Sequence, residues 1–104
     1  MTDDSKLQRM QSVEQALHTQ TAQRAAHQSQ MNEVENATRE LAEAKESYRI
    51  VGNIMVKAAP EKLKSELEER KATLQARISA IERQEQKLRE EMQRLQKEIL
   101  GAKE

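Results

Sequence analysis

The sequence contains one aromatic residue, Tyr48, and neither phenylalanine nor tryptophan in its 104 residues. A globular domain of this length needs large side chains to fill its interior, and these are missing. Charged residues make up 35% of the chain, whereas it has only two glycines and one proline. This composition is typical of long helices and coiled coils, which bury a narrow seam. We therefore expect a mainly α-helical chain without a compact monomeric core.

The charge balance limits the kinds of partner that we expect, and the lack of cysteine limits the cellular compartment. The 18 basic and 18 acidic side chains cancel, and nucleic-acid binding is not expected because neutralising phosphates needs a basic excess. The absence of cysteine fits a reducing compartment, so the cytoplasm is the expected location. The longest apolar run, residues 54–56, is far shorter than the roughly 20 residues of a membrane-spanning helix. We expect no secretory signal and no membrane association.

Two stretches carry the apolar periodicity of helices, and their interiors lack glycine and proline. From about Asp4 to Lys45, the heptad positions are Met10, Val13, Leu17, Gln20, Arg24, His27, Met31, Val34, Thr38 and Leu41. From about Pro60 to Leu100 the repeat is more regular, with Leu67, Leu74, Ile81, Leu88 and Leu95 every seven residues and Ile78, Met92 and Ile99 at the companion heptad positions. Pro60 suits the first turn of a helix, and Gly101 suits its end. The sequence therefore predicts two long coiled-coil helices.

Between these helices, residues 48–57 concentrate the β-branched side chains that the helices avoid. The segment reads Tyr-Arg-Ile-Val-Gly-Asn-Ile-Met-Val-Lys and predicts two short strands around Gly52 and Asn53, with glycine first as a type II′ turn prefers. The alternative is a plain loop that caps a helical hairpin. We prefer the β-hairpin, because a solvated loop has no reason to gather this many apolar side chains.

A turn at residues 52–53 implies antiparallel helices, in which residues whose numbers sum to about 105 face each other. The two heptad assignments, made separately, then match: Met10 with Leu95, Val13 with Met92, Leu17 with Leu88, Met31 with Leu74 and Thr38 with Leu67. A shift of one helix along the other by one heptad would pair the same heptad positions equally well. Polar positions cluster as well, since Gln20 falls opposite Glu85, Arg24 opposite Ile81 and His27 opposite Ile78. We expect the pairing to be weakest there.

Burial decides the expected quaternary structure. Alternation in the hairpin puts Ile50 and Met55 on one face and Val51, Ile54 and Val56 on the other. A two-stranded hairpin is marginal alone in water, and no other segment of this chain can cover both faces and both edges. We therefore predict an obligate oligomer in which hairpins of several subunits close a β-barrel. The predicted oligomerisation hairpin consists of Tyr48, Ile50, Val51, Gly52, Asn53, Ile54, Met55 and Val56.

The remaining polar side chains do not suggest catalysis or metal binding. Nine residues separate His18 from His27, which places them on opposite helix faces, whereas a metal needs convergent ligands. Glu85 lies on the predicted seam with no nucleophile or second carboxylate converging on it, so we interpret it as a polar residue that fixes register. The two glycines lie far apart, so no glycine-rich loop indicates a nucleotide-driven cycle. We expect no enzyme activity, no cofactor and no metal.

The hairpin segment 48–57, together with the helix that contains Glu-Arg-Gln-Glu-Gln-Lys-Leu at residues 82–88, resembles the beta-type subunit of prefoldin, especially its archaeal form. The likeness covers about residues 47–100, and over residues 1–46 it rests on helical pattern and length. It implies a coiled-coil helix at 1–46, an oligomerisation hairpin at 47–58 and a second coiled-coil helix at 59–104. It also implies a hexamer of two alpha-type and four beta-type subunits.

The resemblance further implies an ATP-independent molecular chaperone, which captures unfolded client polypeptides at the coiled-coil tips and delivers them to a group II chaperonin. In this chain the tip residues would be Leu7, Met10, Val13, Leu17, Met92, Leu95, Ile99 and Leu100. Leu7 and Leu100 lie off the heptad rows and are the stronger candidates for client contact, because the seam explains the others. The alternative function is a structural coiled-coil scaffold or tether, which would use its seam for one defined partner.

Overall fold

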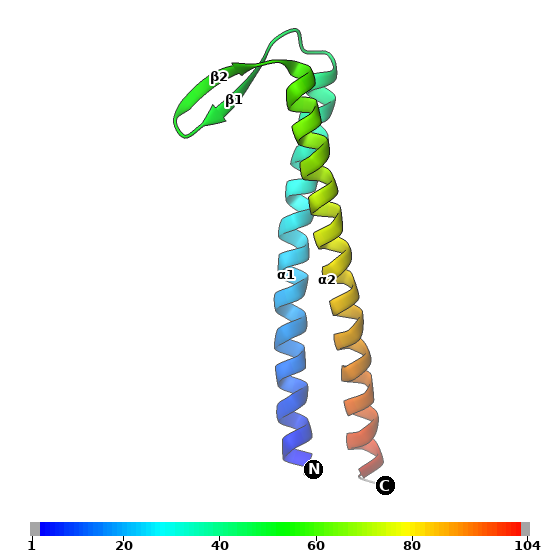
Figure 1. The fold of residues 1–104 in the computed structure, drawn as a ribbon. Coiled ribbons are helices and arrows are strands. Elements are labelled where there is room, and N and C mark those ends of the chain that lie inside the picture. The colour runs from blue at the N-terminus through cyan, green and yellow to red at the C-terminus, as the bar shows by residue number, and fades with distance from the viewer. Residues whose placement is uncertain (1–2, 103–104) are drawn as a thin grey trace. The chain divides into compact units, whose positions relative to one another are not determined.

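The computed structural model describes residues 3–102, which form two helices and two strands. Helix α1 spans Asp3–Ala42, strand β1 spans Ser47–Val51, strand β2 spans Ile54–Ala58 and helix α2 spans Pro60–Ala102 (Figure 1). These two long helices with an antiparallel hairpin between them confirm the predicted fold class. Neither helix, over the residues described, is long and apolar enough to cross a membrane.

The two helices end at residues other than those the sequence indicates. α1 ends at Ala42 and not near Lys45, because the amide of Ala44 donates to the carbonyl of Leu41 at 3.2 Å and closes a tight turn. α2 continues through Gly101, so the stop predicted at that residue is wrong. A glycine permits a helix to end but does not force it to do so.

The start of α2 agrees with the sequence. The carbonyl of Ala59 accepts the amides of Lys62 and Leu63, each at 3.1 Å, so Ala59 precedes the first helical residue. Pro60 occupies that first position, where its missing N–H leaves no hydrogen bond unmade. The methyl side chain of Ala59 cannot accept a hydrogen bond, and the helix therefore begins without a side-chain cap.

The strands β1 and β2 form the predicted antiparallel hairpin. Ile50 lies opposite Met55, and Val51 lies opposite Ile54. Gly52 has a φ of 61°, and no non-glycine residue in the described chain has a positive φ. A positive φ at the first central position alone defines a type II′ turn, whose twist matches that of the flanking strands. The alternative of a plain loop is therefore excluded.

The first of two compact units contains the beginning of α1 and the end of α2, residues 3–26 and 78–102 as described. The helices run antiparallel in this unit, since Lys6 pairs with Glu98 at 3.8 Å and Arg9 pairs with Glu91 at 2.6 Å. Its buried apolar side chains are Val13, Ile81, Leu95 and Ile99. All four occupy predicted heptad positions, so this unit buries the narrow seam that the sequence indicates.

The second compact unit, residues 27–77, contains the end of α1, the hairpin and the beginning of α2. Met31, Val34 and Leu74 are buried here, and Met31 and Leu74 are predicted to face each other. The ammonium of Lys71, on the seam of α2, lies 4.0 Å from the carboxylate of Glu35 on α1. The second unit therefore combines a short helical seam with the hairpin.

Candidate functional site

The hairpin presents apolar side chains on both of its faces. The strand register places Ile50 and Met55 on one face, and Val51, Ile54 and Val56 on the other, as strand alternation predicts. These five side chains are between 47% and 73% exposed. Large apolar side chains gathered in this way mark an interaction surface.

The sheet has only these two strands within residues 3–102, so the outer edge of each strand keeps free backbone groups. Unpaired edges readily accept another strand, and proteins normally cover them. The hairpin therefore offers a partner both hydrogen bonds along its edges and apolar contacts on its faces.

The base of the hairpin is fixed within the second unit. The hydroxyl of Ser47 donates to the carbonyl of Ala58 at 2.5 Å, and Ser47 is buried. The guanidinium of Arg49 donates to the carboxylate of Glu66 on α2. These contacts are not evident from the sequence pattern. The free part of the hairpin therefore begins at about residue 50.

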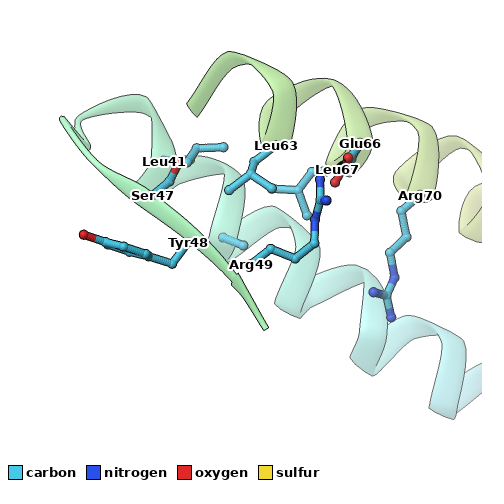
Figure 2. Close-up of a pocket in the computed structure, with 9 residues that line it drawn as sticks. Leu41, Ser47, Tyr48, Arg49, Leu63, Glu66, Leu67 and Arg70 are labelled. Atoms are coloured by element: carbon cyan, nitrogen blue, oxygen red, sulfur yellow. Dashed lines mark hydrogen bonds and ion pairs between the residues drawn. The ribbon is translucent and has the colours of Figure 1, made fainter. Parts of the chain in front are cut away.

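An open groove of about 440 Å³ lies where the hairpin meets the helices (Figure 2). Its apolar lining comes from Leu41 on α1 and from Leu63 and Leu67 on α2. Figure 2 shows Arg49 reaching from the strand toward α2, whereas the ring of Tyr48 extends from the other side of the strand. The Tyr48 hydroxyl donates to Glu46 at 3.0 Å. The groove therefore lies between the apolar side chains of the two helices and strand β1.

The helix ends in the first unit differ from the hairpin, because most of their apolar side chains pack against each other. Leu7 and Leu100 are the exceptions, at 47% and 62% exposed. The other predicted tip residues divide into a half-buried set of Met10, Leu17 and Met92 and a buried set of Val13, Leu95 and Ile99. The two leucines outside the heptad rows are thus the ones that the paired helices leave uncovered.

A charged cluster lies within the apolar seam of the first unit. Glu85 on α2 is 1% exposed, and both of its carboxylate oxygens have donors. Arg24 Nε donates to one oxygen at 2.6 Å, and the Thr21 hydroxyl donates to the other at 2.9 Å. Arg89, one turn further along α2, lies 3.6 Å from the second oxygen. The buried carboxylate therefore receives two hydrogen bonds from α1 and lies near a cation of α2.

The cluster perturbs both charged partners. The hydrogen bond from Arg24 lowers the pKa of Glu85 below its usual value, and the bond from Thr21 acts in the same direction, although burial opposes them. The same hydrogen bond raises the pKa of Arg24. Glu85 is therefore ionised at neutral pH.

The sequence identifies Glu85 as a polar seam residue but does not identify its hydrogen-bond partners. Pairing of heptad positions puts Gln20 opposite Glu85 and Arg24 opposite Ile81. In the structure, the long side chain of Arg24 reaches one turn along α2 to the carboxylate. Arginine spans more than one heptad position, which the simple pairing rule ignores.

The histidines do not converge on a common site. His18 is exposed, and His27 is half-buried with a buried Nδ1 that has no hydrogen-bond partner. Within the described chain, no three histidine, aspartate or glutamate side chains gather to hold a metal ion.

The sequence and the fold correspond to a known family. Residues 4–102 match the family described as prefoldin subunit. The chain belongs to the prefoldin family. It is also similar to the crystal structure of the prefoldin beta subunit from Thermococcus strain KS-1, with 31% sequence identity and a TM-score of 0.91 over 96% of this chain and 90% of that one. No curated protein sequence matches the chain significantly.

These matches confirm the predicted resemblance and are consistent with a beta-type subunit. They support a chaperone-type role, and membership of the family implies assembly with other prefoldin subunits.

Proposed function

We propose that this chain is a subunit of an ATP-independent holdase chaperone. Its hairpin, residues 47–58, joins hairpins of other subunits in an intersubunit β-barrel, in a hexamer of two alpha-type and four beta-type subunits. The segments 1–46 and 59–104, which contain α1 and α2, form the client-binding arms. The observation that carries the proposal is the hairpin with apolar side chains exposed on both faces and with both edges open.

The hairpin supports assembly because one chain cannot cover it. The base is fixed by Ser47 and by the Arg49–Glu66 pair, so the exposed part keeps a defined geometry. Strands added at its edges satisfy the free backbone groups, and closure into a barrel removes the remaining edges. The apolar side chains of residues 50–56 then lose contact with water, which provides the main free energy of assembly.

The helix ends support client capture. Leu7 and Leu100 are exposed and available for apolar contact. Fraying of the last turns adds the half-buried Met10 and Met92, because helix ends open locally at low cost in free energy. The flexible thioether side chains adapt to irregular surfaces, so the binding has low sequence specificity. Delivery of the held client to a group II chaperonin, in the cytoplasm, completes the proposed cycle.

The test is aggregation of several unrelated unfolding proteins, followed by light scattering without ATP. The purified chain, assembled with an alpha-type prefoldin subunit, is expected to delay aggregation of each of them. If it protects none of them and binds one defined partner through its helices, the chain is a structural scaffold or tether and the chaperone proposal is wrong.

A further inference from the structure

The buried charge of the first unit has a geometric consequence for the helix ends. Apolar heptad rows alone do not determine how far α1 slides along α2, since a shift by one heptad keeps apolar positions facing apolar positions. Glu85 does distinguish one register from another, because it is almost fully buried and its hydrogen-bond donors come from fixed positions on α1.

A one-heptad shift in either direction would remove those donors. In one direction, Gln28 and Met31 would take the places of Thr21 and Arg24 beside Glu85. In the other direction, Glu14 and Leu17 would take those places and would bring a second carboxylate to the buried one. Arg89 would stay near Glu85 after a shift because both lie on α2, but the two hydrogen bonds from α1 would be lost. Loss of hydrogen bonds to a buried carboxylate is strongly unfavourable, and a like charge increases the cost in free energy.

The other ion pairs described between the helices of this unit do not favour one helix register over another in the same way. Lys6–Glu98 and Arg9–Glu91 lie at the surface, where the water-screened attraction of an ion pair is weak. Water would also solvate their partners after a shift. Among the ion pairs between the described residues of this unit, only Arg24–Glu85 joins a buried carboxylate to a donor on the facing helix.

We propose that Arg24 and Glu85 are positioning residues that fix the register of the paired helix ends and thereby hold Leu7 and Leu100 at the same level. A slip of seven residues displaces one helix along the other by about 10 Å. Leu7 and Leu100 would then lie at different levels and could not contact one client segment together. This inference rests on the proposed client-binding role of the helix ends, but the register itself can be measured without a client.

The chain has no cysteine, so two engineered cysteines carry spin labels at defined sites. Gln8→Cys and Lys97→Cys label exposed positions on the two helices of the first unit. Labelled chain is diluted with unlabelled chain in the assembled complex, and pulsed dipolar spectroscopy measures the distance within one subunit. A single distance population is expected for the parent sequence.

Glu85→Leu is expected to add a second distance population, displaced by an axial offset of about 10 Å, because an apolar seam accepts both registers. The charge-swapped Arg24→Glu/Glu85→Arg variant is expected to restore the single population. Glu98→Gln, which removes an exposed partner of Lys6, is the matched control and leaves the distance unchanged. Should Glu85→Leu not fold, Arg24→Leu/Glu85→Leu removes both members of the pair between the helices and is expected to give two populations.

An unchanged single distance in the apolar variant that folds would overturn the proposal. Aggregation suppression is measured in parallel. A slipped register with undiminished suppression would overturn the positioning of the leucines, whereas a parent chain that suppresses no aggregation would overturn the chaperone function and leave the register result standing.

Discussion

Ile50 and Met55 in the hairpin are exposed, whereas the paired helix ends bury the side chain of Leu95 and also the carboxylate of Glu85. The hairpin therefore exposes apolar side chains to water, whereas the paired helix ends bury a charged side chain. An exposed apolar surface gains free energy from almost any apolar partner. A buried carboxylate is stable only with correctly placed donors. The hairpin therefore drives association between subunits, and the buried carboxylate favours one register of the paired helices.

Replacement of an exposed apolar residue of the hairpin by a charged one should weaken subunit association, and this is the largest effect that we predict. Ile50→Asp is expected to weaken subunit association by at least a hundredfold, since it removes about 2–3 kcal/mol of apolar burial and adds a carboxylate to the interface. Sedimentation velocity measures the loss of the assembled species. Lys57→Gln, on the same hairpin, is the control, and a retained assembly in Ile50→Asp would contradict the role of the hairpin.

Removal of the exposed apolar side chains at the helix ends should affect activity without affecting assembly. Leu7→Ser/Leu100→Ser is expected to reduce aggregation suppression severalfold, because each leucine offers about 2 kcal/mol of burial to a client. Light scattering measures suppression, and sedimentation checks that the assembly mass is unchanged. Leu7→Met/Leu100→Met keeps the apolar contact and should remain active, whereas an active serine variant would remove these two residues from the client site.

Acidification should destabilise the helix ends through Glu85. The pKa of Glu85 is lowered in the folded protein, so its stabilising effect is complete above the unfolded pKa of about 4.3. That effect is lost as the pH falls below this value and through the folded pKa. The difference in unfolding free energy between the parent and Glu85→Gln is therefore expected to shrink below about pH 4. Hydrogen exchange of residues 78–102 at several pH values measures it, and a difference that stays constant would show that the charge of Glu85 is not involved.

A side chain at the turn should have a smaller effect, confined to the hairpin. Gly52→Ala puts a Cβ on a residue with a φ of 61° but meets no atom within 4 Å, so the cost is conformational strain alone. We expect about 1–2 kcal/mol of lost stability. Urea denaturation of the assembled complex measures it. The matched change Asn53→Ala, next to it at negative φ, should cost less, and equal losses would argue against the type II′ turn.

The smallest expected effect is a gain in stability at the start of α2. Ala59→Ser supplies the missing side-chain acceptor for the first amides of the helix, and this is expected to add about 1 kcal/mol. Thermal unfolding followed by circular dichroism measures the gain. Ala58→Ser, one residue earlier, lies outside the cap position and should give none.

The sequence was sufficient for the elements and for the hairpin register, because each depends on local rules. Leu67, Leu74 and Leu95 reveal a helix by their spacing, and Gly52 followed by Asn53 indicates the turn. The end of α1 was misplaced by about three residues, since the tight turn at Ala44 has no glycine or proline to mark it.

The contacts made by long polar side chains could not be predicted. Arg24 reaches Glu85 from a position assigned to face Ile81, and Arg49 reaches Glu66 although the sequence pattern gives no sign of this pair. Such contacts depend on rotamers and on the exact distance between helices, which a heptad pattern does not contain. The exposed Leu7 and Leu100, in contrast, could be singled out because they fall outside the heptad rows.

The central claim is that the apolar hairpin is covered by other subunits. The most direct measurement is the mass of the purified chain, alone and mixed with an alpha-type prefoldin subunit, by sedimentation at micromolar concentration. We predict assembled species and, in the mixture, a hexamer in which the amides of residues 47–58 are protected from hydrogen exchange. A stable folded monomer with these amides exchanging freely, both alone and in the mixture, would contradict the claim.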